Sequence, residues 1–159
     1  MPGRLRTSTP SMTLRILLRW HRALGLPQQP KYWYRDRLRE ETLERRRAET
    51  RWAHLSETAD IFYILSRARH DGYPLCPLPP FSYKHVAVYA YMLPKYTLRW
   101  AFYRIAAALC RHGDVSSVSE VVNPSKDGKL QEVACRHGIE PTNFLRVCRS
   151  LRLVWPLLP

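Results

Sequence analysis

Prolines and glycines divide this chain into short segments, and within each segment the apolar residues recur at the three- and four-residue spacing of a helix. The first such run contains Leu14, Leu17 and Leu18 and ends at Gly25 and Pro27. A chain patterned in this way buries one stripe of each segment when it is helical, and would scatter the same residues over both faces of a strand. The pattern therefore predicts an all-α protein.

The spacing and the breakers together predict where the helices lie. Helices are expected over 11–24, 31–52 and 56–70, joined by short loops as an up-down-up three-helix bundle. Residues 71–81 hold four prolines and one glycine, which predicts a stiff connector and a domain boundary. In the helical C-terminal domain, residues 82–159, the expected helices are 82–93, 95–111, 129–137 and 141–155, with Pro94 breaking or kinking the chain between the first two.

Composition limits the class of protein and the kind of partner. Hydrophobic residues make up 45% of the 159, enough for a core, so wholesale disorder is excluded. No apolar run approaches the roughly 20 residues of a membrane-spanning helix. With 26 Lys and Arg against 13 Asp and Glu, the net charge of +13 favours an anionic partner. Four cysteines without a CxxC pair favour a reducing compartment.

The N-terminus is basic and free of acidic residues up to Asp36. Residues 1–10 are either a loose basic tail or the start of a presequence. An Arg-rich, Ser- and Thr-containing start that leads into an amphipathic helix is typical of a mitochondrial import signal. We therefore expect the protein to be localised in the mitochondrial matrix, with the nucleus as the alternative.

Two short patterns resemble a known family. Trp20, His21 and Arg22 are followed by Ala23 and Leu24, and the next segment contains Tyr34, Arg37, Leu38 and Arg39. This order resembles the LYR-motif family of small mitochondrial helical proteins, in which a Leu-Tyr-Arg triplet precedes a basic, aromatic second helix. The resemblance covers about the first 70 residues. Only Arg22 of the triplet is retained, and Thr42 stands where the family has Phe.

The resemblance implies a non-catalytic adaptor or assembly factor that binds an acidic protein, the mitochondrial acyl carrier protein, whose acyl chain would enter the three-helix core. The implied partner-binding residues are Trp20, His21, Arg22, Arg35, Arg37 and Arg39. Arginine forks suit carboxylates and phosphates alike. The alternative is an ordinary helical bundle with a solvated basic face.

The last two segments predict a pair of helices like a helix-turn-helix unit. Ala134, Gly138 and Ile139 occupy positions where such units need a small residue, a tight turn and an apolar contact. The alternative partner is therefore a nucleic acid, either DNA or RNA, the latter including RNA of the mitochondrial ribosome. The candidate contacts are Thr142, Asn143, Arg146 and Arg149. The same spacing also arises in any two helices that cross steeply.

Other patterns have both a functional and a purely structural explanation. The aromatic residues between Tyr83 and Tyr103, interleaved with Lys95 and Arg99, would suit base stacking but are more often core residues. The sequence Cys-Arg-His-Gly occurs twice, at 110–113 and 135–138, and its two Cys and two His could form a zinc site. Each Gly stands where a helix is expected to end, which explains the repeat without a metal, so no metal site is expected. No phosphate loop, nucleophile elbow or paired carboxylate motif is present, so we expect neither an enzyme nor a cofactor.

Overall fold

The computed structural model describes residues 12–156, and this part of the chain contains helices and no strands, as the sequence pattern predicts. The basic tail or presequence expected over residues 1–10 lies outside the described residues. The elements are α1 (Met12–Leu24), α2 (Lys31–Arg47), α3 (Arg51–His70), α4 (Val86–Leu109), the 3-10 helix η1 (Val115–Ser117), α5 (Asp127–Arg136) and α6 (Pro141–Arg152). No helix within residues 12–156 is long and apolar enough to cross a bilayer.

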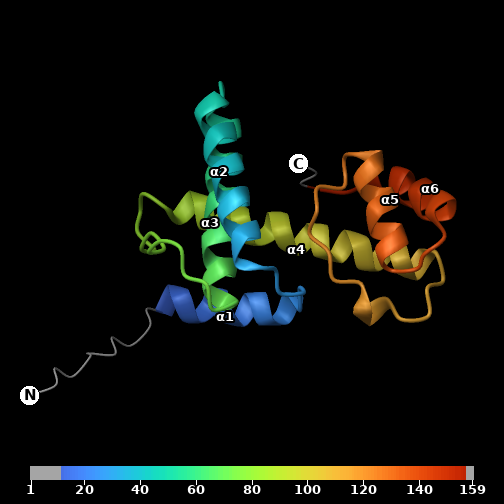
Figure 1. Cartoon of the computed structure of the whole chain (residues 1–159). Helices are drawn as coiled ribbons and strands as arrows, with labels where there is room; N and C mark the ends of the chain where they lie inside the picture. The colour runs from blue at the N-terminus through green and yellow to red at the C-terminus, as the bar shows by residue number, and fades with distance from the viewer. Residues whose placement is uncertain (1–11, 157–159) are drawn as a thin grey trace, which may run out of the picture.

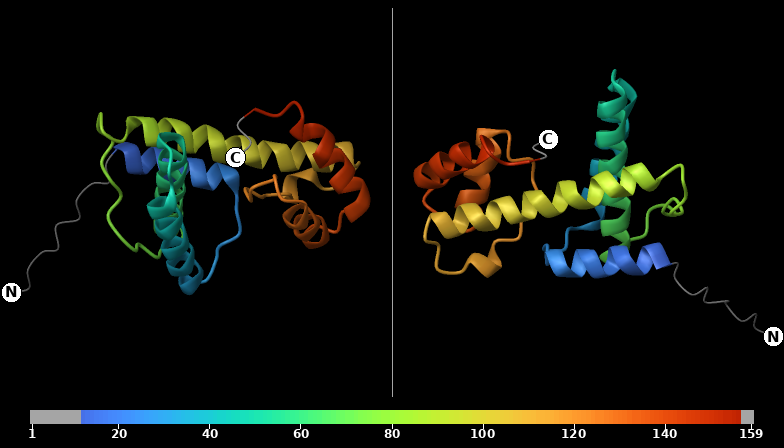
Figure 2. Two further views of the ribbon diagram at one scale, coloured as in Figure 1. Left: turned by 90° about the horizontal axis from the view of Figure 1, so that it is seen from above. Right: turned by 180° about the vertical axis from the view of Figure 1, so that it is seen from behind.

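The long helix α4 connects two lobes (Figures 1 and 2). In the N-terminal lobe, α1, α2 and α3 pack with the first half of α4. In the C-terminal lobe, η1, α5 and α6 pack with its second half. Residues 71–81, the expected domain boundary, form a loop between α3 and α4. The two cores do not divide at this loop, because both include residues of α4.

The up-down-up bundle expected for the N-terminal lobe is not confirmed. Helices α2 and α3 form a hairpin, and α1 lies across its base and beside α4 (Figure 1). Two tryptophans hold α1 there: Trp20 Nε1 donates to Thr97 Oγ1 at 3.0 Å, and Trp100 Nε1 donates to the Leu24 carbonyl oxygen at 3.0 Å. The buried face of α1 thus meets both α3 and α4, because α4 completes the lobe as a fourth helix.

The boundary between α2 and α3 lies earlier than the sequence pattern predicts. The chain leaves the helix after Arg47, and α3 begins at Arg51. Thr50 caps α3, since its hydroxyl oxygen accepts from the Ala53 backbone N–H at 3.1 Å. Threonine is a good N-cap because its side chain replaces a missing helical acceptor.

Of the two outcomes expected at Pro94, a break or a kink, the break is wrong. Helix α4 runs without interruption from Val86 to Leu109, with Pro94 inside it and exposed. Buried residues on both sides of Pro94, among them Tyr91 and Lys95, keep the helix packed through this position. Tertiary packing therefore outweighs the missing backbone hydrogen bond.

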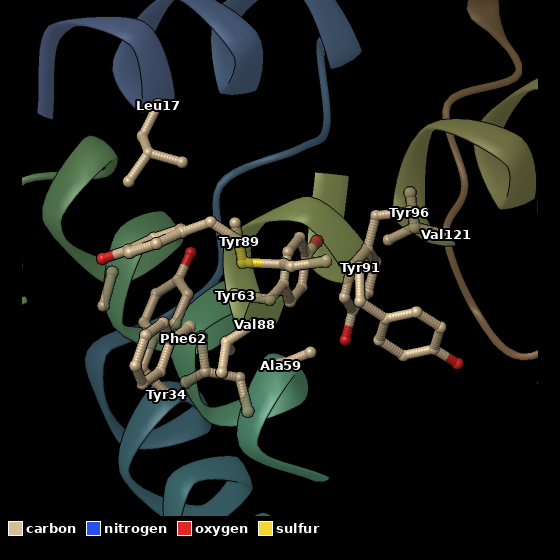
Figure 3. Packing of buried hydrophobic residues seen from close by; sticks show 13 residues of the cluster. Leu17, Tyr34, Ala59, Phe62, Tyr63, Val88, Tyr89, Tyr91, Tyr96 and Val121 are labelled. Carbon is tan, nitrogen blue, oxygen red and sulfur yellow. The ribbon is translucent and has the colours of Figure 1, made fainter. Parts of the chain in front are cut away.

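The core of the N-terminal lobe is rich in tyrosine (Figure 3). Leu17 from α1 and Phe62 from α3 pack in one cluster with Val88, Tyr89 and Met92 from α4. The rings of Tyr63 and Tyr96 stack with centroids 3.6 Å apart. Most aromatic residues of α4 are core residues, so their explanation is packing.

The two helices of the C-terminal pair meet at a tight turn, as predicted. Gly138 adopts a left-handed φ of 65°, which a residue with a side chain rarely adopts. Glu140 then caps α6, and Pro141 occupies its first turn. At the other Cys-Arg-His-Gly repeat, Arg111 rather than Gly113 carries the positive φ, 58°.

Candidate functional site

A cleft of about 960 Å³ separates the α2–α3 hairpin from the C-terminal lobe. We call it the central cleft. One wall comes from α2 and α3, the floor from α4, and the other wall from residues 119–123 and α5. Among the lining residues are Arg37, Glu41, Asp60, Tyr63, Lys95, Tyr96, Arg99 and Val121.

A buried ion pair lies at the floor of the central cleft. Lys95 Nζ lies 2.8 Å from each carboxylate oxygen of Asp60 and 2.9 Å from Ser56 Oγ, and Tyr96 donates its hydroxyl to Asp60 at 2.8 Å. Burial lowers the pKa of Lys95, against the opposing effect of Asp60, and burial likewise raises the pKa of Tyr96 well above its usual value. Each polar group has a partner, so the cluster stabilises the contact between α3 and α4.

Arg99 lies one helical turn beyond Lys95 and is only 6% exposed. Its guanidinium lies 5.4 Å from the centroid of the Tyr96 ring, and its Nε is buried without a hydrogen-bond partner. Among residues 12–156, nothing forms an ion pair or a hydrogen bond with it. Arg99 is therefore a buried cation in the cleft without a counter-ion.

Three glutamates of the α2–α3 hairpin make this wall of the cleft acidic. Burial, followed by the negative charge of Asp60, raises the pKa of Glu41 to about 7, although Arg37 opposes the shift. Glu41, Glu44 and Glu57 place carboxylate oxygens within 4.8 Å of one another, a spacing that metal ligands share. Exposed acidic groups often cluster without an ion, so this geometry alone does not define a metal site.

The structure divides the six partner-binding residues implied by the resemblance into two groups. Arg22, Arg35 and Arg39 are exposed. The other three make contacts within the protein: Trp20 bonds to Thr97, His21 is buried against Ser66 at 2.7 Å, and Arg37 is paired with Glu40 and Glu41. His21 is a core residue and not a surface residue, because it lies on the buried stripe of α1.

Residues of α4 occupy the core between α1, α2 and α3, where the resemblance implies an acyl chain. Val88, Tyr89 and Met92 of α4 fill it, packed against Leu17 and Phe62. Protein interiors are packed as densely as organic crystals, so a chain could enter only if α4 moved away.

The nucleic-acid candidates on α6 are largely engaged within the C-terminal lobe. Arg149 Nη2 lies 2.6 Å from an Asp127 carboxylate oxygen, and Arg146 donates to Asn143 at 2.7 Å. The Glu140 carboxylate accepts from the Thr142 and Asn143 backbone N–H groups at 2.8 and 2.6 Å. An anionic cap therefore occupies the N-terminus of α6, where a phosphate would otherwise bind.

The sequence pattern indicates Arg99 only as part of an aromatic segment that would suit base stacking, and it does not identify Asp60. Lys95 and Arg99 are four residues apart, and such a pair usually lies on the solvated side of a helix. One feature of the sequence does indicate that Lys95 and Arg99 are buried. Aromatic residues surround both of them, at 91, 96, 100, 102 and 103. A helix that is apolar all round is buried all round, and its charged residues are then buried too.

These observations define an all-helical protein of two lobes joined by one helix, with a charged cleft between them. No protein-family model, curated protein or solved structure matches the chain.

Proposed function

We propose that this protein is a non-catalytic helical adaptor that binds an acidic protein through the exposed arginines of α1 and α2. We refer to the exposed Arg22, Arg35 and Arg39 together as the cationic surface. The partner that the LYR-like pattern favours is the mitochondrial acyl carrier protein, which would place the adaptor in the mitochondrial matrix.

The proposal rests on the exposure of these arginines and on how few ion pairs they form. Arg22 and Arg35 are exposed and form no ion pair within residues 12–156. Arg39 has an 80% exposed side chain and only a 3.8 Å approach to Asp36. The loop between α1 and α2 is residues 25–30, so Arg22 in the last turn of α1 and Arg35 near the start of α2 are close along the chain. Uncommitted guanidinium groups suit the carboxylates of an acidic helix.

Binding of the purified chain to a purified acyl carrier protein, measured by calorimetry at low and high salt, tests the proposal. Arg22→Glu and Arg35→Glu should each weaken the complex by at least about tenfold, because each reversal replaces attraction by repulsion. The matched control is Arg146→Glu, the same charge change on the exposed face of α6, which should leave the affinity unchanged. Added salt should weaken the wild-type complex.

The proposal also specifies how the partner's acyl chain behaves. Because α4 fills the core of the N-terminal lobe, acyl-loaded and acyl-free carrier protein should bind with similar affinity. Carrier protein that fails to bind at low salt, or that binds all three variants equally, would contradict the proposal. Retention of RNA that only Arg146→Glu abolishes would assign binding to the C-terminal pair instead.

A further inference from the structure

The central cleft holds a buried cation, Arg99, that the described part of the chain does not neutralise. Arg99 is 6% exposed, its Nε is sealed from solvent without a partner, and it forms no ion pair within the described part of the chain. Removing a charge from water is strongly unfavourable unless a counter-ion or hydrogen bonds replace the water. The stacked contact with the Tyr96 ring, at 5.4 Å, replaces only part of that hydration. The geometry is that of a receptor for an anion.

The other buried or half-buried cations of the cleft are already paired. Lys95 is held by Asp60, Arg37 by Glu40 and Glu41, and Arg67 bonds to the Tyr63 hydroxyl at 3.0 Å and the Pro27 carbonyl oxygen at 2.7 Å. The acidic residue on the opposite wall, Glu120, is likewise paired, with Arg136 and His137. Three other charged residues of the lining, Glu44, Glu57 and Lys126, also form no ion pair within residues 12–156, but none of them is buried. A single buried guanidinium is balanced by an anion with a single negative charge. A carboxylate carries that charge and matches the fork of a guanidinium, whereas a phosphate dianion would leave excess negative charge.

The apolar and aromatic residues of the cleft indicate what the rest of the ligand would be. The cleft lining also includes Ile64 of α3 and the stacked rings of Tyr63 and Tyr96. Val121 lines the cleft too and packs in the same cluster as Tyr63 and Tyr96 (Figure 3). A volume of about 960 Å³ lies within the range of small-molecule sites. We propose that the central cleft binds a small organic carboxylate with an apolar or aromatic body, its carboxylate paired with Arg99. This site is separate from the cationic surface and does not depend on the adaptor proposal.

Thermal unfolding of the full chain with 3-phenylpropionate tests the site. At saturating concentration the probe should raise the wild-type Tm by about 2–4 °C, because it binds only the folded state. The neutral amide 3-phenylpropionamide, which has the same body without the charge, should give no rise, and inorganic phosphate should give a smaller one. Ligand-observed saturation-transfer NMR provides a second measure of binding.

The variants assign the effect to Arg99. Arg99→Met should abolish the carboxylate-dependent rise and, without ligand, should have a higher Tm than wild type, because it removes a buried charge that has no counter-ion. Arg104→Met is the matched control, since Arg104 belongs to the same helix but packs on Trp100 at 4.4 Å outside the cleft lining. It should respond to the probe like wild type. Arg99→Lys keeps the charge but not the fork, and should show a reduced rise.

Three results would overturn the inference. The first is an equal response to the carboxylate and to its amide, and the second is a larger response to phosphate. The third is an Arg99→Met variant that still responds like wild type. If Arg99→Met fails to fold, the comparison of Arg99→Lys with wild type decides the matter, and an unreduced rise counts against the site.

Discussion

His21 shows how burial changes the chemistry of a single residue. Its ring lies among those of Trp20, Tyr63 and His70, with centroids 4.7, 5.6 and 5.5 Å away, and it is 2% exposed. Burial, followed by the positive charges of His70 and Arg67, lowers the pKa of His21 from 6.5 to about 3. The folded protein therefore keeps this imidazole neutral at a pH where the unfolded chain protonates it.

This difference predicts an acid-sensitive fold. Between pH 6.5 and 3 the unfolded chain binds a proton that the folded chain does not, so the free energy of unfolding falls as the pH falls, by up to about 1.4 kcal/mol per pH unit. His21→Gln retains a polar partner for Ser66 but does not titrate. Urea unfolding between pH 4 and 7 should show a flatter dependence for the variant. Parallel curves for the two proteins would contradict the assignment.

Glu41 should act in the opposite direction. Its pKa is raised from 4.5 to about 7, so the folded chain binds the proton more tightly than the unfolded chain over that range. Its contribution to the free energy of unfolding therefore decreases as the pH rises from 4.5 to 7. Glu41→Gln should gain stability relative to wild type between pH 4.5 and 7.5, measured by urea unfolding at both values. A difference between the two proteins that is the same at both pH values would show that Glu41 does not titrate in this range.

At the scale of the element, α4 carries both lobes in spite of Pro94. Proline lacks the N–H that would bond to the Ala90 carbonyl oxygen, and its ring crowds the preceding turn. The helix nevertheless continues for 15 further residues to Leu109, because residues on both sides of Pro94 are buried. Packing on both sides of Pro94 thus offsets the missing hydrogen bond, which a substitution should restore.

Pro94→Ala should raise the free energy of unfolding by about 1–3 kcal/mol, since it restores one helical hydrogen bond and removes the ring. The matched control is Pro80→Ala, in the loop before α4, which restores no helical bond and should not stabilise the fold. Chemical denaturation of the three proteins measures the effect. Equal stability of Pro94→Ala and wild type would show that α4 has already relaxed around the proline.

For the whole molecule, the shared helix implies that the two lobes are coupled. Phe102 of α4 is fully buried in the C-terminal core, against Tyr103 and Trp155, while Tyr96 lies in the other core less than two turns earlier. Disruption of one core therefore removes support from the helix on which the other core is built.

Phe102→Ala should cost about 3–5 kcal/mol, the usual cost of a cavity left by a buried phenylalanine. Because α4 is shared, amide exchange should become faster in α3 as well as in α6. Phe62→Ala, the matched truncation in the N-terminal core, should speed exchange in α6 by the same route. Exchange that changes only in the lobe carrying the substitution would show that the lobes unfold independently.

The sequence by itself determined the secondary structure wherever the signal was local. The helical class, the end of α1 at Gly25, the turn at Gly138 and the start of α6 at Pro141 all follow from backbone preferences and side-chain spacing within a few residues. The same reasoning misplaced the start of α3, because the Thr50 cap competes with a helical pattern that continues through it.

Contacts between distant parts of the chain set which helix faces are buried and what they meet. Helix α4 is apolar enough to serve two cores, so Pro94 is tolerated, α1 packs beside α4, and Arg99 lies inside a cleft rather than on a solvated face. Local spacing identifies a stripe on a helix, but the burial of a charge depends on residues far away in the chain, such as Tyr63 and Val121, that close around it. Of the candidate site, the sequence therefore indicated the exposed arginines of α1 and α2, whereas the central cleft arises from long-range packing.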